Sequence, residues 1–408
     1  MRNSWVLMAV TMLLGLPGIF LRLTGMEFGT VPDTAIFGLA IVASAFLLSW
    51  AAEAAEVDIS QSLAVAFIAL IAVLPEYAVD ITFAWKAGQD PAFEHFAVAN
   101  MTGANRLLIG AAWPLVFFLF WLKVRQRVLA LERGHAIEVL ALAVATLYSF
   151  TIPLKGEIAL YDTVILAAVF AGYVYLIAKA PTEEPELVGP ARTIGGLPKL
   201  QRRAAIGVLF AYAAAAILAS AEPFAEGLVH SGTELGIDEF LLVQWLAPFA
   251  SEAPEFLVAG ILAFRGRAGA GMGALISSKV NQWTLLIGGI PVAYALSKGA
   301  WTGLPLDGHQ QEEVLLTAAQ SAFAVAILAS LTLSAWEAVA LFVLFAFQFA
   351  VPNQEVRIGV SVVYLVLTVG ILIWHRSSLP SLVRSARQAI AEYGAAAAHE
   401  RAEPKLGP

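Results

Sequence analysis

The chain of 408 residues contains no cysteine, so disulfide bonds and metal sites built from thiolates are excluded. Its six histidines show no spacing typical of metal ligands. Charged residues are scarce, at 13% of the chain, and the net charge of −7 is spread over short loops without a basic stripe between aromatic residues. We therefore expect no nucleic acid among its partners.

Apolar residues are abundant instead. They make up 59% of the chain and occur in runs of roughly twenty or more, the length that an α-helix needs to cross a bilayer. We predict twelve spans, at residues 4–24, 33–57, 60–87, 92–122, 136–153, 158–178, 204–230, 238–264, 269–298, 311–332, 335–351 and 356–374. The composition therefore predicts an all-α polytopic membrane protein surrounded by the lipid bilayer, and it predicts no oligomeric state.

Lysine and arginine are distributed unevenly between the two ends of these spans. They collect in the loop 123–133, in the stretch 181–203 and after residue 375. Because basic loops stay on the cytoplasmic side, we predict a multi-pass protein of the plasma (inner) membrane with both termini in the cytoplasm. The first span has an alternative interpretation as a signal peptide, since Arg2 precedes its apolar run, although no clear cleavage site follows.

A polar stretch with four prolines divides the chain into two halves. An odd number of crossings in each half inverts the second half relative to the first, as in the inverted repeats of many secondary transporters. We predict two inverted five-helix repeats plus extra N- and C-terminal helices. The units are an additional N-terminal helix that is a possible signal anchor (1–32), the first repeat (33–180), a cytoplasmic linker (181–203), the second repeat (204–351), an additional C-terminal helix (352–375) and a polar cytoplasmic tail (376–408).

Two short segments with a Pro-Glu pair lie at corresponding positions of the two halves, Leu74-Pro75-Glu76 and Ala253-Pro254-Glu255. A carboxylate inside a membrane-length segment is costly to bury, so matching acids indicate a shared ion site. Proline removes a backbone donor and frees a carbonyl, so each helix is expected to break there. Glu76 shares a helix face with Asp80, and Glu255 shares one with Glu252, so both faces can point at one cavity.

Each acidic helix is followed by a span with amides and hydroxyls near its middle. The first carries Asn100 and Asn105, and the second carries Ser277, Ser278 and Gln282. These side chains supply neutral oxygen ligands for a hard cation. The alternative is that they only join helices through hydrogen bonds.

At these segments the chain resembles the sodium/calcium exchanger superfamily, also called the calcium:cation antiporters. That family carries two inverted repeats, each with a Gly-Thr-Ser-x-Pro-Glu helix followed by a helix reading approximately Gly-Asn-x-x-Gly-Ser-Asn-x-x-Asn. Residues 71–76 and 250–255 match the first pattern, and residues 99–108 and 273–282 match the second. The resemblance implies a secondary active antiporter that exchanges calcium or another cation for sodium or protons by alternating access at a midplane carboxylate site. It implies no cofactor apart from the transported cation.

Departures from the family pattern concern the ligands. Ala72 and Val73 replace the Thr and Ser of the first repeat, and Glu252 replaces the Ser of the second, where Ser251 keeps a hydroxyl. The central Asn is kept as Asn105 but becomes Lys279 in the second repeat. We hypothesise that Lys279 is a built-in counter-ion, displaced or deprotonated when a cation binds, which would couple transport to protons.

The predicted ion site combines both repeats. Its ion-binding residues are Glu76, Glu255, Asp80, Glu252, Asn100, Asn105, Ser251, Ser277, Ser278 and Gln282, with Glu76 and Glu255 contacting the metal and Lys279 coupling charge. Arg106 is expected to be a structural partner rather than a ligand.

Three other functions are possible interpretations of the same residues. One is a sodium/proton antiporter in the same fold, in which Lys279 couples the protons. Another is a non-transporting scaffold. The third is an intramembrane metal-dependent enzyme, which we do not predict because no cytoplasmic loop carries a cluster of aspartates.

Overall fold

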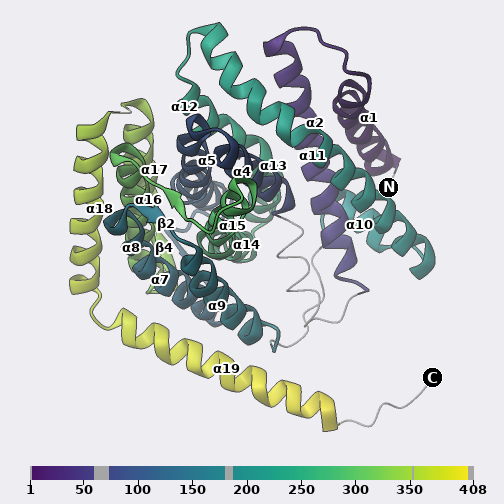
Figure 1. The fold of residues 1–408 in the computed structure, drawn as a ribbon. Helices are drawn as coiled ribbons and strands as arrows, with labels where there is room; N and C mark the ends of the chain where they lie inside the picture. The colour runs from purple at the N-terminus through teal and green to yellow at the C-terminus, as the bar shows by residue number, and fades with distance from the viewer. Residues whose placement is uncertain (1, 59–72, 180–186, 352, 403–408) are drawn as a thin grey trace.

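The computed structural model describes residues 2–58, 73–179, 187–351 and 353–402, with the side chains of 2 and 394–402 left out. Within these residues the chain is almost entirely helical, as Figure 1 shows. Eight helices are long and apolar enough to cross a membrane, and Ala335–Ala350 is a shorter apolar helix. The all-α polytopic architecture is therefore confirmed, whereas residues 60–72 of the predicted third span lie outside the described residues.

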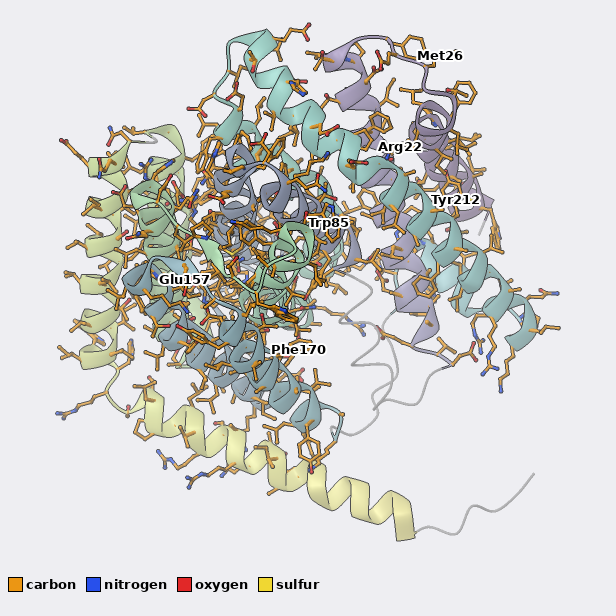
Figure 2. All side chains as sticks on the ribbon, viewed as in Figure 1. Arg22, Met26, Trp85, Glu157, Phe170 and Tyr212 are labelled. Atoms are coloured by element: carbon orange, nitrogen blue, oxygen red, sulfur yellow. The ribbon has the colours of Figure 1, made fainter. Side chains whose placement is uncertain are left out.

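Four helices form one group, which we call the α2–α11 bundle. Its members are α1 (Arg2–Thr24), α2 (Thr30–Ala55), α10 (Gly189–Gly195) and α11 (Lys199–Leu235). Figure 1 shows them together at the right, where α1 and α10 pack on α2 and α11. In Figure 2, Arg22 and Tyr212 are labelled; the first bonds to Glu222 and the second donates to the Met12 carbonyl, so α1 is joined to α11.

The remaining helices form the core that carries the predicted site. Its first-repeat members are α4 (Leu74–Gln89), η1 (Pro91–Phe93), α5 (Glu94–Leu107), η2 (Leu108–Ala112), α6 (Trp113–Val124), η3 (Arg133–His135), α7 (Ala136–Ser149), α8 (Thr151–Lys155) and α9 (Leu160–Ile177). Its second-repeat members are α12 (Glu239–Leu241), η4 (Leu242–Leu246), α13 (Ala247–Phe264), α14 (Ala268–Asn281), η5 (Gln282–Leu286), α15 (Ile287–Lys298), α16 (Gly308–Leu328) and α17 (Ala335–Ala350). Two helices follow them, α18 (Gln354–Trp374) and α19 (Ser378–Ala402).

The internal repeat is visible in the lengths of corresponding helices. In both halves a 14-residue helix is followed by a five-residue π-helical turn and a 12-residue helix, which gives α5–η2–α6 and α14–η5–α15. Both runs then end on a residue in the left-handed region, Arg125 at φ 62° and Gly299 at φ 68°. Different sequences thus fold into the same local structure in the two halves.

Two short antiparallel ribbons join the first repeat to the second. β1 (Val128–Ala130) pairs with β4 (Thr332–Ser334), with Leu129 opposite Leu333. β2 (Glu157–Ile158) pairs with β3 (Leu304–Pro305). The strands place loops from both halves side by side.

The two Pro-Glu segments take different positions in their helices. α4 begins at Leu74 with Pro75 in its first turn. Backbone N–H groups in the first turn have no partner within the helix, so the N–H that proline lacks removes no helical hydrogen bond. The break expected at Pro254 is wrong, because α13 continues through this residue from Ala247 to Phe264. A single proline removes only one hydrogen bond, and the packing of α13 on α2 and α14 retains the helix.

The predicted linker and the predicted polar tail both contain helices. The described part of the linker includes α10 and the first turn of α11, with residues 181–186 outside the described range. The predicted polar tail forms α19, apart from residues 403–408, which are not described. Apolar residues spaced along each helix explain this, because they pack on α2 and α7 respectively.

Candidate ion-binding site

The four predicted carboxylates come from two core helices. Glu76 lies in the first turn of α4 and Asp80 one turn later, whereas Glu252 and Glu255 lie in the middle of α13. Glu76, Asp80 and Glu252 are at most 2% exposed, and Glu255 is half-buried. So many buried acids without basic partners on the same helices require neutralisation by cations or protons.

Gln282 joins the acids of the two repeats. Its Nε2 donates to Glu76 Oε2 at 2.7 Å and to Glu252 Oε1 at 2.8 Å. Gln282 is the first residue of the π-helical turn η5, and such turns rotate the residues before them relative to those after them. The helices α4 and α13 therefore bring their acids together, as predicted, and the Gln282 amide nitrogen lies between Glu76 and Glu252.

The side-chain amide of Asn100 binds the carboxylate of Asp80. Asn100 Nδ2 on α5 donates to Asp80 Oδ1 at 2.6 Å. Gly103 allows α5 to approach closely, because a Cβ at this position would lie 1.8 Å from the Gln244 carbonyl oxygen of η4. Any larger residue would push α5 and its amide away.

Several buried oxygens of this cluster have no hydrogen-bond partner among the described residues. They are Glu76 Oε1, Asp80 Oδ2, Asn100 Oδ1, Glu252 Oε2, Glu255 Oε2, Ser278 Oγ and Gln282 Oε1. Ser278 lies beside Glu255. Within the described ranges no three Asp, Glu or His side chains are arranged to hold a metal by themselves, so a cation here would also need amide or hydroxyl oxygens. Carboxylate, amide and hydroxyl oxygens together are the ligands of hard cations such as Ca²⁺.

Lys279 does not contact the carboxylates. Its Nζ lies 2.5 Å from Asn105 Oδ1, 3.4 Å from the Asn105 carbonyl oxygen and 4.1 Å from the centre of the Trp283 ring. In the part of the chain that the structure describes, no carboxylate oxygen lies within 4.0 Å of this ammonium. It nevertheless lies in the electrostatic field of Glu252 and Glu76. The central residues of the two repeats therefore bond to each other, and the lysine is fully buried.

Three predicted ligands are bonded elsewhere. Ser277 Oγ donates to Glu138 Oε1 at 2.9 Å and contacts the Tyr173 hydroxyl at 2.8 Å. Ser251 Oγ bonds to the carbonyls of its own helix. Asn105 is held by Lys279 and by the Met101 carbonyl. Adjacent positions on a helix point about 100° apart, so Ser277 and Ser278 cannot both face the acids.

Two polar contacts near the site were not predicted. Asn281, which has no family match, accepts a hydrogen bond from the Tyr77 hydroxyl at 2.8 Å, next to Glu76. Arg106 forms a buried ion pair with Glu313, whose Oε2 also accepts from Gln244 at 2.9 Å. Arg106 is therefore a structural partner, as expected. The acids inside the predicted span 311–332 could have indicated a counter-ion for Arg106.

Comparison with known proteins identifies the class of membrane protein to which the chain belongs. The profile of the sodium/calcium exchanger protein family matches residues 34–179 and 206–352, that is, both repeats. The chain belongs to the sodium/calcium exchanger family and is a transmembrane cation antiporter. A search of the curated proteins gives no match.

Solved structures agree with this assignment. The crystal structure of an H⁺/Ca²⁺ exchanger, CAX, is 46% identical, with 95% of this chain and 99% of that chain covered and a TM-score of 0.91. Native YfkE is 13% identical, with 89% and 100% covered and a TM-score of 0.59. The sodium-calcium exchanger NCX_Mj is 16% identical, with 84% and 100% covered and a TM-score of 0.52. The latter two share the fold.

Proposed function

We propose that this protein exchanges Ca²⁺ for protons at the cluster of Glu76, Asp80, Glu252 and Glu255. The observation that carries the proposal is the bridge from Gln282 to Glu76 and Glu252, because it holds acids of both repeats at one point. The identity of 46% with an H⁺/Ca²⁺ exchanger supports calcium and protons as the exchanged ions. We further propose that the chain resides in the plasma (inner) membrane with both termini in the cytoplasm.

The exchange follows from charge balance in a dry core. Carboxylates buried to this extent must be either protonated or paired with a cation, since an uncompensated buried charge is very unfavourable. Protons and Ca²⁺ therefore compete for the same oxygens. The empty, charged site opposes the switch between the two sides of the membrane, so one ion leaves only when the other replaces it.

Alternating access requires a part that moves against the site. The α2–α11 bundle contacts the core where α2 packs on α13 and α11 packs on α4, the two helices that carry the acids. Displacement of this bundle relative to α4 and α13 would open the cluster to one side at a time.

A sodium/proton antiporter remains the second candidate because of Lys279. The Lys279 side chain occupies the place of the family's central Asn, and its Nζ lies against Asn105 and the Trp283 ring. We propose that Lys279 carries a positive charge near Glu252 and Glu76 while the site is empty, which reduces the positive charge that a bound ion has to supply. When a cation binds, Lys279 is displaced or loses its proton, which couples transport to protons.

Flux in proteoliposomes distinguishes these functions. Purified protein is tested with ⁴⁵Ca²⁺ and ²²Na⁺ separately, each against outward proton and sodium gradients, with Glu76→Gln and Glu255→Gln as controls. We expect proton-driven calcium uptake that both substitutions abolish. Proton-driven sodium movement without calcium uptake would establish the second candidate, and flux of neither ion would favour a non-transporting scaffold.

A further inference from the structure

The helix α19 follows closely on a helix that is able to cross the membrane. α18 ends at Trp374, whose side chain is 84% exposed, and α19 begins at Ser378. Figure 1 shows α18 upright at the left edge and α19 running crosswise below it, under α7 and α9. This placement puts α19 at the end of a membrane span and across its direction, where an amphipathic helix can lie along the membrane surface.

One stripe of α19 is docked on the protein. Leu382, Ala386 and Ala389 are at most 3% exposed and face α7 and η3. The Tyr393 hydroxyl lies 2.6 Å from the position that a Cβ on Gly134 would take. These contacts fix the rotation of the helix, so the directions of its other faces are defined as well.

The exposed faces of α19 follow one another in a specific order. At about 100° per residue, the stripe next to the docked one carries Leu379 and Val383, which are 42% and 37% exposed. The following stripe carries the exposed Arg384 and Arg387, and the last stripe carries Ser381, Gln388 and Glu392. Around the helix the environment thus changes from protein to exposed apolar, then basic, then uncharged and acidic. A helix in a lipid interface needs this order, from hydrocarbon through phosphate to water.

Neighbouring elements add positive charge at the same place. Arg376, just before α19, and Arg133, on η3, which packs on α19, are both exposed. Arg384 Nε donates to the Pro380 carbonyl at 3.3 Å, which holds its guanidinium on the outer side of the helix. Between residues 378 and 393 the only acid is Glu392, on the last stripe. The charge therefore complements an anionic surface.

We propose that α19 binds the headgroups of anionic phospholipids through Arg384 and Arg387, with Leu379 and Val383 in the lipid interface. The bound lipid surface holds the helix against α7 and η3. This inference does not depend on which ions the antiporter exchanges.

Hydrogen–deuterium exchange of the full-length protein in nanodiscs tests the proposal. Discs of phosphatidylcholine alone are compared with discs that also contain phosphatidylglycerol. We expect the α19 amides to exchange several-fold more slowly with phosphatidylglycerol, and the difference to shrink at high salt. The double variant Arg384→Gln/Arg387→Gln should lose the difference. Arg384→Lys/Arg387→Lys should keep most of it, because attraction to headgroups depends mainly on charge.

Three outcomes would overturn the inference. One is equal exchange of α19 in both kinds of disc, and another is slower exchange that survives the glutamine substitutions. The third is protection that appears only in discs holding two copies of the protein, which would assign this face to a second copy of the chain. The exchange of α7 amides in the same spectra shows that the variants remain folded.

Discussion

At the scale of single residues, Gln282 hydrogen-bonds to predicted ligands from both repeats. The Gln282 Nε2 donates hydrogen bonds to both Glu76 and Glu252. The Gln282 Oε1 is among the buried oxygens that have no hydrogen-bond partner among the described residues. A neutral amide can hold two carboxylates without neutralising them, so their charge stays available to a cation or to protons. This is a positioning role that no basic residue could perform.

Replacing Gln282 by leucine should therefore weaken calcium binding. Both carboxylates would lose a donor, and hydrogen bonds to charged groups contribute about 1.5–3 kcal/mol. We expect the calcium concentration for half-maximal uptake to rise roughly tenfold or more, measured by ⁴⁵Ca²⁺ uptake. Thr284→Val is the matched control, because Thr284 lies in the same π-helical turn and its hydroxyl donates to carbonyls of the preceding helical turn. An unchanged calcium dependence in the leucine variant would contradict this role.

Lys279 supports a second prediction at this scale. Removing its positive charge near Glu252 and Glu76 favours their protonated forms, so calcium should displace protons less readily at a given pH. We expect Lys279→Ala to move the midpoint of pH-dependent calcium uptake to higher pH. Lys298→Asn, at the far end of α15, should leave the midpoint in place. If Lys279→Ala has the pH profile of the unmodified protein, the counter-ion hypothesis fails.

At the scale of helices, a group of ion pairs connects the α2–α11 bundle to the core. Lys86 on α4 pairs with Glu226 and, at 3.0 Å, with Glu222, both on α11. Arg22 on α1 pairs with Glu222 at 2.6 Å, inside the bundle. Pairs this exposed contribute little stability, so their significance lies in which helices they connect.

Cross-linking can test whether the bundle moves against the core. Because the chain has no cysteine, the pair Lys86→Cys/Glu226→Cys can be linked selectively by a short bifunctional maleimide. We expect the link to block most calcium exchange. The control pair Arg22→Cys/Glu222→Cys joins two helices of the same bundle and should leave exchange unaffected once linked. Full exchange across a linked Lys86–Glu226 pair would disprove relative movement at this contact.

At the scale of the whole molecule, stability has a pH-dependent component outside the membrane. The guanidinium of Arg202 hydrogen-bonds the Asp58 carboxylate at 2.7 and 2.9 Å and lowers its pKa below the usual range, with smaller contributions from Arg203 and Lys199. A carboxylate with a lowered pKa stabilises the fold above its unfolded pKa. That contribution is lost as the pH falls through the folded pKa.

Asp58→Asn should therefore lower the melting temperature of the detergent-solubilised protein by a few degrees at neutral pH. The difference from the unmodified protein should shrink as the pH falls below the ordinary pKa of aspartate, about 3.9. Melting curves across this range measure it. Arg203→Gln should have a smaller effect than Arg202→Gln, since Arg203 is half-exposed and its Nε lies 3.7 Å from Asp58. A constant difference at every pH would exclude the ion pair as its source.

Local features of the sequence determined the architecture and the main acids. Apolar runs indicate membrane helices because the requirement to satisfy every backbone group in lipid is met inside each helix. The two Pro-Glu segments at corresponding positions predicted that both repeats contribute to one cluster, and Gln282 does join Glu76 to Glu252.

Only the tertiary structure decided which polar neighbours face that cluster. Ser277 and Ser278 are adjacent in sequence, yet the first bonds to Glu138 and the second lies beside Glu255. The pairing of Lys279 with Asn105 and of Arg106 with Glu313, and the helical tail α19 on α7, likewise depend on contacts between distant segments. Helical periodicity tells which residues share a face, but the rotation of one helix against another is set by packing across the whole molecule, including close approaches such as Gly103 on Gln244.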